Sequence, residues 1–347
     1  MTCLRRANGL TAAGLVAIPF SPNLMSDIAL PETVRPAPRG VPKGAAVARV
    51  FEGLCFAAAT ALLAALGGLL ASLLIGGWPA LKTFGFSFLT TSTWNPVTDV
   101  YGAAGPIVGT VVTSALALAI ALPIAGGVAF FLTELCPAPL RRPIGTAVEL
   151  LAGIPSIVYG MWGLFVFAPM FSKFIQMPLM MAAKPGSLLE KLTTGIPNGS
   201  GILPASIILA IMILPFMAAT LRELLLTVPA AVRESAYGLG ATTAEVVMSV
   251  TLPYVRAGAI GAVMLGLGRA LGETMAVTFI IGNSHGLPKS LFDSGSTIAS
   301  TIANEFTEAS TPMHSAALIA LGLVLFLITF TVLGLARLLL RLQEHRA

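Results

Sequence analysis

Six long apolar stretches dominate this chain, and each is near or above the ~20 residues that an α-helix needs to cross the hydrocarbon core of a bilayer. They lie near residues 51–75, 106–133, 144–171, 202–222, 256–282 and 314–338. Lipid offers no hydrogen-bond partners to a free backbone, so each stretch must be helical. The sequence therefore predicts an all-α integral membrane protein with six transmembrane helices.

The composition argues against several other classes of protein. Of the 347 residues, 56% are hydrophobic and only 10% are charged, whereas a soluble domain carries about 25% charged residues. The net charge of +5 comes without a basic stripe interleaved with aromatic residues, so no nucleic-acid partner is expected. The three cysteines and three histidines lack disulfide or zinc spacing, so no metal and no cofactor are expected. No Gly-rich loop ending in Lys and Ser or Thr occurs, so the chain does not bind ATP by that device.

The distribution of positive charge predicts the orientation of the spans. If both termini are cytoplasmic, fourteen of the 20 Lys and Arg residues fall on cytoplasmic segments, and one, Arg269, lies within a span. The five that fall outside are Lys82, Lys173, Lys184, Lys191 and Lys289. Cytoplasmic loops of membrane proteins collect Lys and Arg, so we expect a multi-pass protein, surrounded by membrane lipid, with both termini in the cytoplasm.

The N-terminal part differs from the rest in composition. Residues 1–44 are rich in Pro, Arg and small residues and are expected to be disordered, whereas residues 45–347 form the transmembrane domain. Residues 10–20 are apolar but too short to span a membrane. Two less favoured alternatives to a disordered cytoplasmic segment are that they form the core of a signal peptide, or that they precede a translation start at Met25 rather than Met1.

The segment between the fourth and fifth spans, about residues 229–253, is predicted to form two short helices. Pro229 suits the first turn of one helix, and Gly240 is a natural C-cap for it. Thr242 and Glu245 have the spacing of a capping box that opens the second. Such a compact element either docks a partner and moves the spans it joins, or lies as an amphipathic loop on the lipid headgroups.

Two charged residues, Arg269 and Glu273, lie within the fifth predicted span. An ionised group at mid-bilayer costs at least about 2.5 kcal/mol, and a spacing of four residues places both on one helix face, where they can pair. Either they form a structural ion pair, or Arg269 is the positive point on the route of an anion and Glu273 holds or releases it. A guanidinium matches phosphate oxygens through paired hydrogen bonds.

The third predicted span contains Glu149 and Pro155. Proline lacks a backbone N–H, so Pro155 is expected to kink this helix. Glu149 lies near its cytoplasmic end, where a structural role is the favoured interpretation.

The segment after the fourth span also carries a recognisable motif. It consists of Glu234, Ser235, Ala236, Gly240, Val250, Leu252 and Pro253. This spacing resembles the cytoplasmic signature of ABC importer permeases, with a small Ser in place of the commoner residue at the second position. In that family the signature forms a coupling helix that sits in a groove of the ATP-hydrolysing subunit. The resemblance implies that Glu234, Ala236 and Gly240 lie in or beside that contact.

Residues 50–340 resemble the permeases of phosphate-specific ABC importers, on motifs at 94–96, 99–103, 149–165, 265–283 and 303–306. The first two motifs and the last point to the PstC-type subunit rather than its PstA-type partner. In this family the Arg and Glu that match Arg269 and Glu273 are implicated in moving phosphate.

The resemblance implies a type I ABC importer permease in the bacterial inner membrane, which translocates inorganic phosphate into the cytoplasm. Its partners would be a PstA-type permease, two ATP-binding PstB-type subunits and a periplasmic phosphate-binding protein. ATP hydrolysis would belong to the PstB-type subunits, so the chain itself is not expected to be an enzyme.

Two alternatives remain at the level of sequence. One is a permease for another oxyanion, such as sulfate or molybdate. The other is a secondary anion transporter, which would predict inverted repeats with interrupted helices at matching positions. Neither such repeats nor a His, Asp or Ser constellation typical of an intramembrane enzyme is visible in the sequence.

Overall fold

The computed structural model describes residues 45–344, with side chains described over 47–338. The predicted disorder of residues 1–44, the signal-peptide alternative and the start at Met25 lie outside the described residues. The chain divides into two units, Met1–Ala64 and Ala65–Ala347. The second unit contains five of the predicted spans and all the candidate site residues.

The described residues are helical and contain no strand longer than an isolated bridge. In chain order the helices are α1 (Ala45–Phe84), α2 (Ser87–Thr90), α3 (Ala104–Phe130), α4 (Ala138–Ala152), α5 (Ser156–Trp162), α6 (Ala168–Phe171), α7 (Met177–Ala182), α8 (Leu188–Thr193), α9 (Ile202–Leu226), α10 (Ala230–Gly238), α11 (Thr243–Val246), α12 (Leu252–Leu271), α13 (Met275–Thr278), α14 (Ile298–Glu305) and α15 (Pro312–Glu344). Wider π-type turns occupy Phe131–Leu135, Gly163–Phe167, Ser172–Gln176 and Val247–Thr251.

Within residues 45–344, six helical segments are long and apolar enough to cross a membrane, which confirms the predicted number of transmembrane helices. They are Val47–Phe84, Ala104–Leu135, Ser156–Ala182, Ile202–Leu226, Thr243–Leu271 and Pro312–Leu338. Three agree closely with the predicted ranges. The first is longer at both ends, while the third and fifth are displaced for reasons that their proline and glycine residues explain.

The core of the Ala65–Ala347 unit is built around α9, which packs against α3, α4 and α12. The contact with α3 uses Ala117, Ala121, Ala125 and Ala129, which recur every four residues and are fully buried. Small side chains on one helix stripe let two backbones approach closely, which is how helices associate inside a bilayer. This tight centre holds the other helices in place.

The third predicted span, 144–171, is wrong at both ends. The helix does not kink at Pro155; α4 ends at Ala152 and α5 begins at Ser156, with Pro155 extended between them (φ −58°, ψ 137°). Proline disfavours a helical conformation in the residue before it, so Ile154-Pro155 separates two helices rather than bending one. The segment that is long enough to span is therefore Ser156–Ala182.

The fifth predicted span, 256–282, starts too late and ends too late. The second short helix of the predicted knob is not separate, because α11, the turn Val247–Thr251 and α12 form one continuous segment from Thr243 to Leu271. The wider turn ends at Thr251, two residues before Pro253, whose missing N–H would otherwise interrupt the helix. At the other end, α12 stops at Leu271 and Gly272 forms its C-cap.

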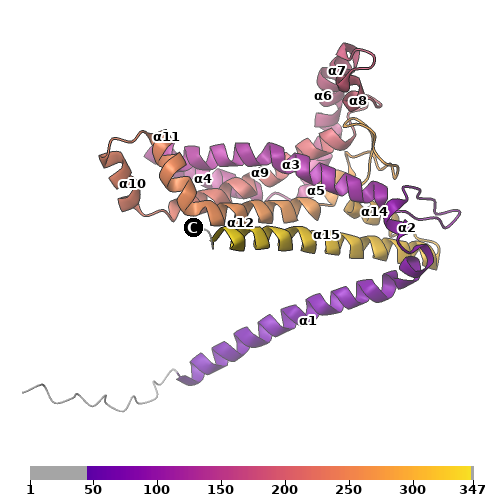
Figure 1. Cartoon of the computed structure of the whole chain (residues 1–347), viewed down its shortest axis with the longest axis horizontal. Coiled ribbons are helices and arrows are strands. Elements are labelled where there is room, and N and C mark those ends of the chain that lie inside the picture. Colours follow the sequence, from indigo (N-terminus) through magenta and orange to yellow (C-terminus); the bar gives the residue numbers. More distant parts are fainter. Residues whose placement is uncertain (1–44, 345–347) are drawn as a thin grey trace, which may run out of the picture. The chain divides into compact units, whose positions relative to one another are not determined.

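Figure 1 shows where the ends of these helices gather within the Ala65–Ala347 unit. The short helices α10 and α11 lie together at one end of the bundle, here called the α10 end. The helices α2 and α14 lie at the opposite end, here called the α14 end. The α12 segment connects the two ends.

Candidate functional site

Arg269 and Glu273 do not share a helix face, so the prediction that they lie one turn apart on the same helix is wrong. Arg269 lies in the last turn of α12, whereas Glu273 follows the C-cap Gly272. The Glu273 Oε1 atom accepts a hydrogen bond from the backbone N–H of Ala276 at 3.2 Å. Glu273 thus helps to satisfy a free N–H at the start of α13. Among the side chains of residues 47–338, Arg269 and Glu273 form no ion pair with each other.

Arg269 is exposed on the surface of the chain rather than sealed in its core. Its guanidinium carbon lies 5.6 Å from the centre of the Phe216 ring on α9, a cation–π contact. It also lines a cavity of about 710 Å³, together with Phe326, Leu333 and Arg337 of α15. Arg269 and Arg337 thus place two positive groups in a largely apolar wall, where they are available to an anion.

The predicted docking residues lie together at the α10 end. Glu234 and Ser235 are exposed on α10, where the Ser235 hydroxyl donates to the Ala231 carbonyl at 2.7 Å, and Ala236 is half-buried. Gly240 follows α10 with φ +87°, in the left-handed region that glycine adopts without strain. Val250 is half-buried in the wider turn, whereas Leu252 and Pro253 are exposed at the start of α12.

The capping box predicted for Thr242 and Glu245 is confirmed. The Thr242 hydroxyl accepts from the Glu245 N–H, and the Glu245 carboxylate accepts from the Thr242 N–H at 2.8 Å. This exchange fixes the angle at which the chain leaves the Gly240 turn and enters the long helical segment.

Two ion pairs brace the α10 end. Arg233 of α10 pairs with Glu134, which lies in the turn after α3, at 2.9 Å, and the Glu134 side chain is only 8% exposed. Arg222 of α9 pairs with Glu149 of α4 at the same distance. Glu149 lies before the membrane-spanning segment Ser156–Ala182 and joins two helices, in keeping with its favoured structural role.

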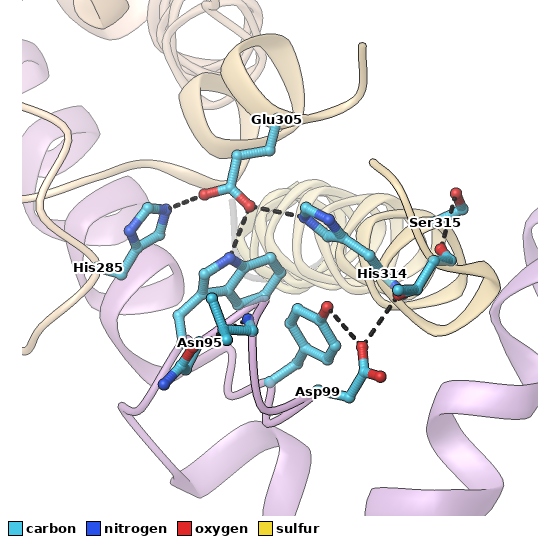
Figure 2. A network of polar contacts seen from close by, with 10 residues as sticks. Asn95, Asp99, His285, Glu305, His314 and Ser315 are labelled. Atoms are coloured by element: carbon cyan, nitrogen blue, oxygen red, sulfur yellow. Dashed lines mark hydrogen bonds and ion pairs between the residues drawn. The ribbon is translucent and has the colours of Figure 1, made fainter. Parts of the chain in front are cut away.

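Sequence reasoning missed a cluster at the α14 end, shown in Figure 2. Glu305, at the end of α14, accepts through Oε1 from His285 Nε2 at 2.6 Å. Its Oε2 atom contacts His314 Nε2 at 2.8 Å and accepts from Trp94 Nε1 at 2.6 Å. Asp99 lies beside this cluster and accepts from the Tyr101 and Thr311 hydroxyls. Trp94, Asp99 and Glu305 all belong to the motifs quoted above, but no pattern in the sequence shows that these motifs meet.

The Glu305 cluster shifts the pKa of its carboxyl. Burial, the largest influence, would raise the pKa of Glu305, but hydrogen bonds from His285, His314 and Trp94 together outweigh it. The pKa therefore lies below its ordinary value of 4.5. The charged form is favoured because donors converge on both carboxylate oxygens.

This pKa shift predicts a pH-dependent contribution to stability. A carboxyl with a lowered folded-state pKa stabilises the fold above its ordinary pKa and loses that contribution as the pH falls through the lower value. At pH 7, thermal unfolding of the Glu305→Gln protein is expected a few degrees below that of wild type. The difference should shrink as the pH falls from 4.5 through the lowered pKa, where the wild-type carboxyl becomes protonated too. Glu308→Gln, an exposed carboxylate three residues further along, should show no such difference at either pH.

Comparison with known proteins agrees with this arrangement. Residues 125–344 match the family described as binding-protein-dependent transport system inner membrane component. The phosphate transport system permease protein PstC of Mesorhizobium japonicum is 55% identical over 300 residues, which cover 86% of this chain and 91% of that protein. The protein of the same name from Pasteurella multocida is 56% identical over 281 residues, covering 81% of this chain and 88% of its own length.

A solved structure shares the fold at low sequence identity. It is a bacterial ABC transporter involved in the import of the acidic polysaccharide alginate, and the superposition has a TM-score of 0.52 at 16% identity. It covers 84% of this chain and 98% of that one. The match to the family model and the high identity to the two relatives show that the chain belongs to the inner-membrane components of binding-protein-dependent transport systems and, within them, to the PstC family of permeases.

Proposed function

We propose that this chain is the permease subunit of an ATP-driven importer that moves inorganic phosphate across the bacterial inner membrane into the cytoplasm. The observation that carries the proposal is Arg269, an exposed guanidinium in the wall of an apolar cavity, in a chain that belongs to the PstC family. The chain makes and breaks no covalent bond itself and is a transport component.

Arg269 is proposed to be the positive point on the phosphate pathway. Its guanidinium donates in a planar fork that matches two oxygens of a phosphate. Among the described side chains no carboxylate neutralises it, so its charge is available to a travelling anion. Glu273, only four residues along the chain and held by Ala276, is proposed to line the same route and to limit how long the anion stays.

The α10 end is proposed to be the docking site for an ATP-binding subunit and therefore to lie in the cytoplasm. Glu234 is exposed there, and Leu239 at the Gly240 turn has 90% of its surface exposed. Both side chains are therefore available for contact with a partner protein. The 14-to-5 bias of positive charge supports the same orientation, with both termini in the cytoplasm.

The fold supports a mechanical connection between this docking site and the pathway. One helical segment of 29 residues runs from Thr243, beside the Gly240 turn, to Leu271, two residues after Arg269. At about 1.5 Å per residue it is stiff over the whole bilayer thickness. The ion pair of Arg233 with Glu134 also joins α10 to the end of α3. Movement of α10 by a partner would thus be carried to the helix that bears Arg269.

The proposed assembly contains a PstA-type permease, two PstB-type ATP-binding subunits and a periplasmic phosphate-binding protein. ATP hydrolysis is assigned to the PstB-type subunits. The α14 end would face the periplasm and receive phosphate from the binding protein.

Uptake by cells tests the proposal and its alternatives. Cells that lack their own phosphate importer and express this chain with its partner subunits should accumulate labelled phosphate, and excess sulfate or molybdate should not compete. Competition by either anion would favour a permease for another oxyanion. Uptake that persists without any ATP-binding subunit would favour a secondary transporter and contradict the proposal.

A further inference from the structure

The Glu305 cluster joins three segments that are far apart in the sequence. Trp94 precedes α3, His285 follows α13, and Glu305 and His314 lie on either side of the turn between α14 and α15. All three contacts of Glu305 converge on one carboxylate (Figure 2). Hydrogen bonds to an ionised acceptor are about twice as strong as neutral ones, so removing this one charge weakens every link at once.

Ring stacking fixes the donors that face Glu305. The Trp94 and His285 rings stack with centroids 5.6 Å apart and an interplanar angle of 11°. Tyr101, which is 1% exposed, stacks on His314 at 5.3 Å and 17°. Trp94 and Tyr101 meet edge to face at 5.0 Å. The ring contacts hold the donors in place independently of the carboxylate, and the cluster therefore has one favoured geometry.

His285 belongs to a segment, residues 283–297, that lies directly on the first turns of α3. A Cβ atom added to Gly105 would collide with the His285 carbonyl oxygen, and one added to Gly109 would collide with that of Ser296. The N–H of Ile298 donates to the Thr110 hydroxyl at 2.9 Å, which ties the end of the segment to α3 as well. Displacing this segment from α3 therefore requires several contacts to break together.

The same segment closely follows the proposed pathway residues Arg269 and Glu273 along the chain. Glu273 caps α13, and the Asn283 side chain donates to the Thr278 carbonyl at 3.1 Å where α13 ends. Glu273 and His285 are only twelve positions apart in the sequence. A shift at the end of α12 must therefore either move residues 283–297 or be resisted by them.

The cluster is poorly suited to bind the anion itself. The carboxylate of Glu305 would repel phosphate, and the nitrogen donors of Trp94, His285 and His314 already bind Glu305. Its contribution is therefore to position the chain rather than to contact the transported ion.

We propose that Glu305 is a positioning residue for transport, whose carboxylate locks residues 283–297 against α3 so that the bundle opens at the α14 end only when these hydrogen bonds rearrange. This inference rests on the proposed function as a phosphate permease. The lock would keep ATP hydrolysis dependent on the binding protein, because the closed arrangement persists until the binding protein docks and drives its opening.

The test uses the complete transporter reconstituted in vesicles, with its permease partner and ATP-binding subunits. In Glu305→Gln, ATP hydrolysis without the binding protein is expected to rise at least about fivefold, the lower range of an allosteric coupling. The phosphate moved per ATP should fall by a similar factor. Trp94→Phe keeps the stacked ring but removes one N–H donor, so it should show a smaller change in the same direction. Glu308→Gln, exposed and outside the cluster, is the matched control and should behave as wild type.

An assembled Glu305→Gln transporter with wild-type hydrolysis and wild-type phosphate per ATP would overturn the inference. Hydrolysis and uptake that fall together with the amount of assembled complex would overturn it too, because they would show a role in folding alone. If Glu305→Gln does not assemble, Trp94→Phe decides the matter by the same two measurements. Failure of the wild-type transporter to move phosphate would instead overturn the proposed function, so the two failures are distinguishable.

Discussion

Cells that carry Arg269→Gln in place of the native residue are expected to take up phosphate at least about tenfold more slowly, because a hydrogen bond to a charged group contributes about 1.5–3 kcal/mol. Glutamine keeps a hydrogen-bonding amide but loses the positive charge and the planar fork of donors. Because Arg269 is exposed and pairs with no carboxylate among the described side chains, its removal leaves no buried charge without a partner. The fold and the assembly should therefore survive the change.

Arg256→Gln is the matched control for this prediction. Arg256 is also exposed and lies on α12, but thirteen residues closer to the α10 end. Phosphate uptake should remain near that of wild type in this variant, and the amount of assembled transporter should be equal in both. Normal uptake by an assembled Arg269→Gln transporter would show that the anion does not depend on this guanidinium.

Gly240→Val is expected to reduce the binding of the ATP-binding subunit by roughly tenfold and ATP-driven uptake with it, because a left-handed backbone costs a non-glycine residue about 1–2 kcal/mol, and tenfold corresponds to 1.4 kcal/mol. At φ +87° a Cβ atom on residue 240 would meet no other atom within 4 Å. The penalty is therefore one of backbone conformation rather than of space. The turn would open and move Leu239 and α10 out of their docking position.

Gly240→Asn separates conformation from bulk. Asparagine is close to valine in size but tolerates the left-handed region, so it should retain most of the binding. Co-purification of the ATP-binding subunit with each variant, together with uptake, measures the effect. Wild-type binding by both variants would contradict the role assigned to this turn, and equal loss in both would show that bulk at the interface matters instead.

The site residues that the sequence identified differ in how well their surroundings could be foreseen. The capping box of Thr242 and Glu245 was predictable because it depends only on contacts between neighbours in the chain. The relative position of Arg269 and Glu273 was not predictable. The expectation that they share a helix face assumed that the helix continues past Gly272, where it in fact ends. Apolar composition continues through residue 282, but the hydrogen bonds that end α12 and start α13 involve Gly272 and Glu273 individually.

The sequence alone determined the class of protein, the number of spans and the turn and helix cap of the proposed docking element. These follow from the length of apolar runs, from the lack of hydrogen-bond partners in lipid and from residues within one turn of each other. Only the tertiary structure decided that Glu305 would bind His285, His314 and Trp94, and that Arg233 would bind Glu134. Trp94 and Glu305 are 211 positions apart, and Arg233 and Glu134 are 99 apart. Such pairings depend on how the whole bundle packs around α9, which no local pattern specifies.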